Sequence, residues 1–512
     1  MSLLWTAGTV AERRALVERS TELTALRDRL TLDLTPFLER PLFVPEEKAL
    51  LSRWGSLCRD DGAELGFDPF APEAQRCTRC GRVWFTEQSR RWWVYWYQLW
   101  LAERVLIAAH LAALGGDARC AARAADALAA IAERYPRYPN HDNVLGPSRP
   151  FFSTYLESVW VLQLAAATSL LGEVGKLPDA LRSRLASDVF APSLALIADF
   201  PESGNRQVWH AVARFALARL LGDEAGASDA ARGPRGVLAT LDAGLAADGL
   251  WFEGENYHWF ALRGLAWGAE LLRSAGETDL WEAPDDLAAK FRAAFRAPVL
   301  TVLPDFTFPA RRDGKFGVTL RQRRMAELWE LAFARLHGDA TASLLRFVYD
   351  PSVPPADDGA RTISDVERNE PPAGVRRDRL GWKALAWMAP SLPNVDADQW
   401  RPGTEHLESS GLAILRRQEG RTYVSLDYGA SGGPHGHADR LNLTVHAMGI
   451  PWLVDFGTGS YVAETLGWYR STFAHCAPGV DGTSQLAADG LCVGFEDQGE
   501  FGWVCAQLPD NT

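Results

Sequence analysis

The spacing of apolar residues divides the chain into a long helical part and a shorter part made of strands. From about residue 8 to 340, apolar positions return every three or four residues, and Gly, Pro and Asp signals separate the runs. About ten helices joined by short loops, without a repeat of fixed period, favour a closed (α/α) toroid of antiparallel helix pairs over a solenoid. The clearest expected helices span 92–114, 121–131, 154–171, 207–221, 257–272 and 320–336.

A different pattern begins after residues 346–405, where prolines and acids crowd together as in a linker. Beyond this stretch apolar residues alternate with polar ones, which predicts antiparallel strands at 423–428, 441–447, 451–456 and 502–508. Only about 105 residues follow the linker, so we expect a sheet or sandwich domain with a truncated C-terminus. The expected domains are 1–90, helical with a cysteine group; 91–345, the toroid; 346–405, the linker; and 406–512, the sheet.

Composition and charge restrict the kind of ligand. The chain has 512 residues and a net charge of −12, which argues against nucleic acid or another polyanion bound over a broad surface. An anionic ligand therefore needs a local basic pocket. No stretch approaches the roughly 18 apolar residues of a membrane span, and the first residues lack the apolar core of a secretion signal. Together with seven cysteines in no evident framework, this predicts a cytoplasmic protein, or a periplasmic or secreted one if a leader was removed.

Histidines gather near the end of the chain. Four of the ten lie between 434 and 482: His435 and His437 precede a strand, His446 lies within it, and His475 follows Asp455 by 20 residues. Imidazoles beside a carboxylate suit a divalent metal ion. The other interpretation is a set of polar loop residues satisfied by hydrogen bonds, and spacing alone leaves both open.

Two segments of the helical part carry further polar side chains. FPESGNRQVWHAVARFAL is typical of a loop running into a helix, with polar groups on neighbouring turns at Asn205, Arg206, His210 and Arg214. DGLWFEGENYHWFALRG opens another helix with Tyr257 and His258. Each residue taken alone also fits a satisfied core position.

These motifs together resemble one enzyme family. H-x-H-x-D, an apolar strand, G-x-x-x-x-x-D-x-G-x-x-x-Y and then Y-R-S-T-x-x-H resemble the C-terminal sheet domain of heparinase II/III-like polysaccharide lyases, and the two helical segments resemble motifs of that family's toroid. The resemblance spans roughly residues 130–485. It implies cleavage of acidic, uronic-acid oligo- or polysaccharides by β-elimination, with no organic cofactor.

The resemblance also implies roles. β-Elimination requires neutralisation of the sugar carboxylate, a base for the C5 proton and an acid for the leaving oxygen. Asn205, His210 and His435 are expected to neutralise the carboxylate, and Tyr257 to be base, acid or both, with its pKa lowered by Arg206, Arg214 or a histidinium. The family also implies a structural zinc or other divalent metal at His437, Asp455 and His475. This chain departs from the family by having Cys476 where Asn usually follows the last histidine.

Further substrate contacts are expected outside this core set. YPNHDNVLGPSRPFFSTYLESVW is either a substrate subsite or a well-capped loop, and it resembles the exo-acting branch that includes exo-type heparinases and exo-type oligoalginate lyases. FPARRDGKFG is the most basic short patch of the toroid, and it meets either a substrate anion or solvent. Exo action on heparin, heparan sulfate or alginate is the resulting expectation. The substrate-binding candidates are Arg149, Glu157, Arg206, Arg214, His258, Arg312 and Tyr461.

Three cysteines near the N-terminus form a separate motif. Cys58, Cys77 and Cys80 resemble a zinc ribbon that lacks one ligand, with Asp60 or Asp61 beside the first cysteine. Three thiolates with a carboxylate or water would hold zinc, and free thiols are the alternative.

Two other functions compete with the lyase. A glycoside hydrolase on a helical toroid would use two carboxylates, for which Glu253, Glu255 and Asp313 are available, but it would not produce an unsaturated sugar. A non-catalytic carbohydrate-binding protein would account for the 20 tryptophans, although many of these fall at helical core spacing.

Overall fold

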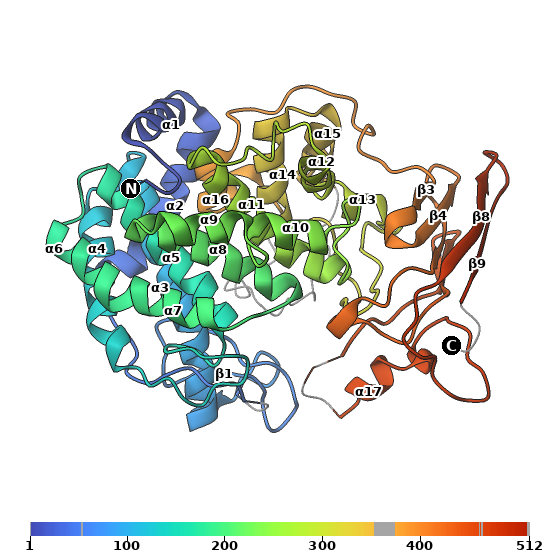
Figure 1. Cartoon of the computed structure of the whole chain (residues 1–512), viewed down its shortest axis with the longest axis horizontal. Coiled ribbons are helices and arrows are strands. Elements are labelled where there is room, and N and C mark those ends of the chain that lie inside the picture. Colours follow the sequence, from blue (N-terminus) through green and yellow to red (C-terminus); the bar gives the residue numbers. More distant parts are fainter. Residues whose placement is uncertain (1, 53–54, 353–373, 460, 462–463, 509–512) are drawn as a thin grey trace.

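The computed structural model describes residues 2–52, 55–352, 374–459, 461 and 464–508. It has a helical part and, at one end of it, an antiparallel sheet (Figure 1). The helices are α1 (Ala7–Arg19), α2 (Thr21–Glu39), α3 (Glu87–Ala113), α4 (Arg119–Arg134), α5 (Thr154–Glu173), α6 (Asp179–Leu185), α7 (Ala191–Asp199), α8 (Gly204–Leu221), α9 (Glu224–Arg232), α10 (Val237–Gly244), α11 (Glu255–Ser274), α12 (Asp286–Ala293), α13 (Ala297–Leu300), α14 (Arg323–Leu336), α15 (Asp339–Val348), α16 (Trp382–Trp387) and α17 (Leu466–Tyr469).

The long helices form a closed ring. Following the chain, α2 packs on α3, α3 on α5, α5 on α8, α8 on α11, α11 on α14 and α14 on α16, and α16 returns to α2. Inside this ring α5 lies between α3 and α8 and is buried on nearly every side, as its apolar composition requires. The outer helix α4 instead buries a single stripe, formed by Cys120, Ala124, Ala127, Leu128 and Ile131. The six helices expected from periodicity are all present.

The helix that closes the ring comes from the stretch expected to be a linker. In α16, Trp382 and Leu385 are buried, and Trp400 further along is buried too. The proline-rich run 353–373 lies outside the described residues. The linker expectation rested on prolines and acids, whereas the packing follows from the apolar residues that come after them. The helix α16 and Trp400 therefore belong to the helical core.

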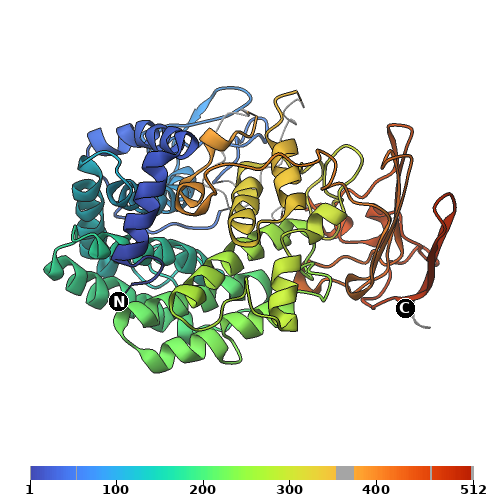
Figure 2. The same ribbon diagram turned by 90° about the horizontal axis from the view of Figure 1, so that it is seen from above.

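The sheet has five antiparallel strands in sequential order, β3 (Glu405–Leu407), β4 (Leu412–Arg417), β5 (Thr422–Asp427), β6 (Asn442–Ala447) and β7 (Ile450–Leu453). A hairpin of β8 (Leu491–Asp497) and β9 (Gly502–Gln507) contacts β4 and lies at the outer end of the molecule (Figure 2). A short ribbon of β1 (Gln75–Arg76) and β2 (Val83–Trp84) precedes α3. The predicted fold class, helical toroid followed by antiparallel sheet, is confirmed. No described helix is both long and apolar enough to cross a membrane.

The inner end of the sheet is joined to the helical part by apolar packing and by a buried ion network. Leu412, Ile414 and Tyr423 of the sheet pack against Leu250 and Leu303. Arg311, in the loop after α13, donates to Glu255 of α11 at 2.9 Å and to Asp427 of β5 at 2.9 Å. These contacts fix the position of the sheet relative to the helical part, although the residues involved are far apart in the sequence.

Candidate active site

Two aromatic rings meet where the helical part joins the sheet. The Tyr257 ring, in the first turn of α11, stacks on the His435 imidazole with centroids 3.8 Å apart and planes at 22°. The Tyr257 hydroxyl forms a hydrogen bond with the Tyr461 hydroxyl. Both Tyr257 and His435 are only partly buried. Tyr257 thus contacts both His435, expected with it to be catalytic, and Tyr461, expected to bind substrate.

Asp313 forms hydrogen bonds with His435 and with two neighbouring side chains of the sheet domain. Its carboxylate accepts from His435 Nδ1 at 2.7 Å, from His437 Nε2 at 3.0 Å and from Arg470 Nη2 at 2.8 Å. Its backbone N–H donates to the His435 carbonyl at 3.1 Å. Although burial alone would raise it, the pKa of this carboxyl lies far below its usual range because of the hydrogen bonds from His435 and His437 and the charge of Arg470. One helical-part carboxylate therefore orients three side chains of the sheet domain.

Glu253 links Asn205 to the other side of His435. Asn205 donates to Glu253 Oε2 through both its backbone N–H and its side-chain amide, each at 2.9 Å, and Glu253 Oε1 lies 3.6 Å from His435 Nε2. Gly204, with φ of +57°, permits this approach, since a Cβ there would lie 2.4 Å from Glu253 Oε1. Asn205 is buried at 3% exposure and reaches His435 through Glu253.

The two phenols are held protonated. Burial raises the pKa of Tyr257 well above its usual range, and the Asp313 and Glu253 carboxylates raise it further against the lowering effect of Tyr461. The pKa of Tyr461 is also strongly raised, by burial and then by Tyr257. The expectation that arginines lower the pKa of Tyr257 was wrong. Arg206 instead pairs with Glu202 and Arg214 with Asp229.

A group of residues able to bind a metal lies directly behind Asp313. His437, Asp439 and His475 place one ligand atom each within 4.8 Å of the others, and His437 Nδ1 is 3.2 Å from His475 Nε2. Asp455, expected as a ligand, lies outside this group and accepts from His475 Nδ1 at 3.0 Å. It thereby orients the ring from its far side, as outer-shell carboxylates do in metal sites.

Two histidines expected at the site are buried away from it. His258 is fully buried: its Nδ1 accepts from the Trp251 N–H at 3.0 Å, so Nε2 donates to the Ala294 carbonyl at 2.8 Å. His210 is 1% exposed, and burial lowers its pKa to about 3. Among the described residues, no hydrogen bond joins either ring to Tyr257 or His435. Both are neutral core residues.

The burial of His258 predicts a pH-dependent stability. Burial lowers the pKa of His258 from 6.5 to about 4, so its contribution is complete above pH 6.5 and is lost as the pH falls towards 4. The full loss is about 3 kcal/mol. Denaturation of wild type and His258→Gln from about pH 8 to pH 5 measures this, because glutamine can replace both hydrogen bonds without titrating. An equally steep pH dependence in the variant would contradict the assignment.

The other substrate candidates also have structural partners. Glu157 is fully buried and accepts from Ser148 at 2.7 Å, Ser193 at 2.8 Å and the Arg149 N–H at 2.9 Å. The Arg149 guanidinium donates to the Pro136 and Tyr138 carbonyls. These contacts fit the alternative of a well-capped loop. Arg312, only 3% exposed, donates to the Phe252 and Ala430 carbonyls, so the patch at 308–317 is not a solvated basic surface.

Sequence reasoning missed the residues that hold His435. Asp313 and Glu253 were considered only as carboxylates for a hydrolase, and Arg470 not at all. Arg470 stands within the Y-R-S-T motif, five residues before His475, and Asp313 follows two arginines that are themselves buried. For Asp313, the local signal was the charged triplet at 311–313 between apolar stretches.

Comparisons with known proteins agree with this architecture. Residues 401–496 match the family described as Heparinase II/III-like, C-terminal. An alginate lyase of Stenotrophomonas maltophilia is 24% identical over 409 residues, which cover 75% of this chain and 51% of that protein. An exo-oligoalginate lyase of Saccharophagus degradans is 23% identical over 391 residues, covering 70% and 49%. The chain thus spans about half the length of these relatives.

Solved structures share the fold. A heparinase III structure superimposes with a TM-score of 0.51 at 14% identity, covering 81% of this chain and 60% of that one. A mutant of the heparan sulfate lyase HepC from Pedobacter heparinus gives a TM-score of 0.50 at 15% identity, covering 91% and 67%. Residues 401–496 are therefore similar to the heparinase II/III-like C-terminal family, and the chain as a whole shares the fold of these two solved structures.

Proposed function

We propose that this protein cleaves uronic-acid oligosaccharides by β-elimination. The observation that carries the proposal is the stack of Tyr257 on His435 between a carboxylate at each imidazole nitrogen. This arrangement joins a proton donor to an oriented base in a partly exposed position. The relatedness to lyases named for alginate supports the same reaction class.

His435 is suited to act as the base. With Nδ1–H donating to Asp313, the lone pair of the ring is on Nε2. Nε2 takes the C5 proton of the uronate, and the C–H electron pair forms the C4–C5 double bond. The Glu253 carboxylate, 3.6 Å from Nε2, stabilises the imidazolium that results.

Tyr257 is suited to act as the acid. As the C4–O bond breaks, the leaving oxygen takes the phenolic proton, which the raised pKa of Tyr257 keeps in place at neutral pH. The hydroxyl of Tyr461 is hydrogen-bonded to Tyr257 and can relay a proton from solvent to the phenolate afterwards, donating its own proton and taking one from water. In the final balance, the proton removed from C5 remains on His435 until it passes to solvent.

The substrate carboxylate must be neutralised before the C5 proton becomes acidic enough to leave. Arg470 is the proposed cation, since its guanidinium is held against Asp313 and its side chain is 35% exposed. The Asn205 amide, fixed by Glu253, is the proposed neutral donor. Because Asp313 and Glu253 offset much of the local positive charge, the site favours an unsulfated uronate such as alginate over a heavily sulfated chain.

A divalent metal fits the group behind Asp313. At Zn–N bonds of about 2.0–2.1 Å, two tetrahedral nitrogen ligands lie about 3.4 Å apart, close to the 3.2 Å between His437 and His475. Asp439 Oδ2 is buried without a hydrogen-bond partner among the described residues, as expected of an oxygen available to an ion. A zinc ion held by His437, Asp439 and His475 would supply a fixed charge that locks His437 and, through Asp313, orients His435.

The reaction is tested by its product. Purified protein is incubated with alginate oligosaccharides, heparan sulfate, heparin and hyaluronan, and the far-ultraviolet absorbance of a C4–C5 unsaturated uronate is followed. We expect that chromophore, strongest with alginate oligosaccharides, and terminal release of short products as in exo action. Sugars released without the chromophore would instead establish a hydrolase using Glu253 and Asp313. No release from any of the four polymers would contradict the proposed activity.

A further inference from the structure

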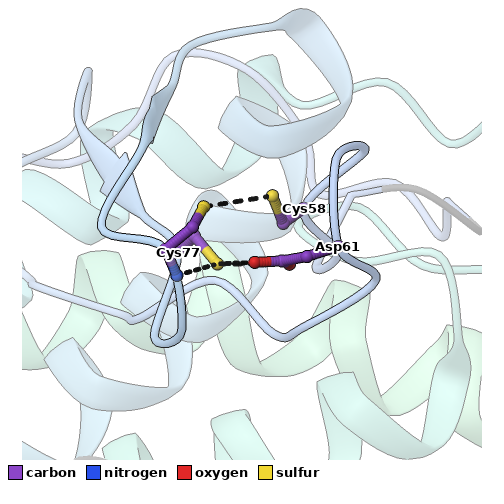
Figure 3. Close-up of side chains that lie close together, drawn as sticks. Cys58, Asp61 and Cys77 are labelled. Carbon is purple, nitrogen blue, oxygen red and sulfur yellow. Dashed lines mark hydrogen bonds between the residues drawn. The ribbon is translucent and has the colours of Figure 1, made fainter.

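Three cysteines and an aspartate converge in the segment that precedes α3. Cys58, Asp61 and Cys77 point towards one another from two loops (Figure 3). With Cys80, their ligand atoms all lie within 4.8 Å of one another, and all seven cysteines of the chain are free. This group involves none of the residues around His435.

The separations between these atoms match a tetrahedral metal site. Two thiolates on one zinc ion, with bonds of about 2.3 Å, lie about 3.8 Å apart, and a thiolate and a carboxylate oxygen about 3.6 Å apart. Cys58 Sγ is 3.8 Å from Cys80 Sγ, and Cys77 Sγ is 3.5 Å from each Asp61 oxygen. A disulfide would instead place its two sulfurs about 2.05 Å apart.

The surrounding donors favour thiolates. The backbone N–H groups of Arg79 and Cys80 both point at Cys77 Sγ from 3.4 Å, and the Trp84 indole donates to Cys58 Sγ at 3.3 Å. Gly81 follows the second cysteine of C-x-x-C with φ of +73°, which permits the tight turn. Such N–H to sulfur contacts stabilise negative charge on the ligands.

This segment has a small core of its own among its described residues. The buried apolar cluster that they form consists of Cys58, Leu65 and Cys77, with Ala63, Trp84 and Trp92 packed partly against it. Small modules with so few buried apolar residues are usually stabilised by a metal or a disulfide.

We propose that Cys58, Asp61, Cys77 and Cys80 bind a structural zinc ion. The ion fastens the loop at 56–66 to the β1–β2 ribbon and holds both against the start of α3. Four protein ligands complete the tetrahedron, so the site is closed to substrate and structural in character. It is independent of the proposed lyase reaction.

Metal content tests the proposal directly. The full chain, purified without chelator, is analysed for zinc by mass spectrometry, beside Cys77→Ser and, as the matched control, Cys505→Ser on the exposed strand β9. We expect Cys77→Ser to lose about one equivalent of zinc and the control to lose none. Equal zinc in all three proteins would overturn the site, as would a disulfide between any two of Cys58, Cys77 and Cys80 in the purified wild type.

Cobalt substitution separates this site from the histidine group and does not depend on a variant that folds. Wild-type protein reconstituted with Co²⁺ should show the near-ultraviolet thiolate-to-cobalt charge-transfer band, which a histidine–carboxylate site cannot produce. Alkylation of the cysteines in the metal-free protein should abolish it. Cobalt binding without that band would overturn the proposal while leaving the histidine site and the lyase reaction untouched.

Discussion

Tyr257→Phe should lower kcat on uronate oligosaccharides by about 100- to 10,000-fold, the range that general acid catalysis contributes. Phenylalanine keeps the ring that stacks on His435 and removes only the hydroxyl that bonds to Tyr461. The loss should therefore fall on the chemical step, with KM little changed. Initial rates from the unsaturated product, measured over a range of substrate concentrations, separate kcat from KM.

Tyr97→Phe is the matched control for this experiment. Tyr97 is also a buried tyrosine, whose hydroxyl donates to the Phe43 carbonyl, but it lies in α3 and makes no contact with the site. It should keep near wild-type kcat. Thermal melting of both variants monitors the fold. A Tyr257→Phe protein that turns over within about twofold of wild type would remove the phenol from the mechanism.

Arg311→Met should lower the free energy of unfolding by about 3–5 kcal/mol, because it leaves two buried carboxylates without their shared cation. Arg311 and its partners Glu255 and Asp427 are each no more than 4% exposed in their side chains. Asp427 keeps a second cation in Arg440, at 3.1 Å, whereas Arg311 is the only ion-pair partner of Glu255 among the described residues. Denaturant unfolding followed by tryptophan fluorescence measures the change.

An exposed arginine pair provides the comparison. Arg119 bonds Asp117 at 2.7 Å on the surface of the helical part, and Arg119→Met should leave the free energy of unfolding almost unchanged. Adding Glu255→Gln to Arg311→Met should recover part of the stability, since it removes one uncompensated charge. If Arg311→Met lowers the free energy of unfolding no more than Arg119→Met does, the ion network does not hold the helical part and the sheet together.

The position of Asp313 explains why these two predictions are connected. Arg311 and Asp313 belong to one short loop: the first residue is anchored to α11 and β5, and the second holds His435 and His437. Loss of the anchor should therefore disturb the orientation of His435 as well as stability. The decisive arrangement, His435 against Tyr257 with Asn205 joined through Glu253, depends on that loop.

The sequence by itself predicted six of the helices, four of the nine described strands and the residues Tyr257 and His435. The spacing of apolar residues is a local property of the sequence. It predicted α3, α5, α8, α11 and β6 because the apolar residues of each of these elements recur at the period of a helix or of a strand. The resemblance of the histidine and tyrosine motifs was specific enough to select residues from two distant segments. The same resemblance correctly predicted a helical toroid followed by an antiparallel sheet.

Only the tertiary structure decided which polar residues meet. Asp313 and His435 are 122 positions apart, and Tyr257 and Tyr461 are 204 apart, so no local pattern records their contacts. His258, next to Tyr257 in the chain, points into the core because neighbouring positions on a helix face different directions. Burial and hydrogen-bond partners depend on what packs opposite each side chain, and that becomes defined only when the ring of helices closes and the sheet docks against it.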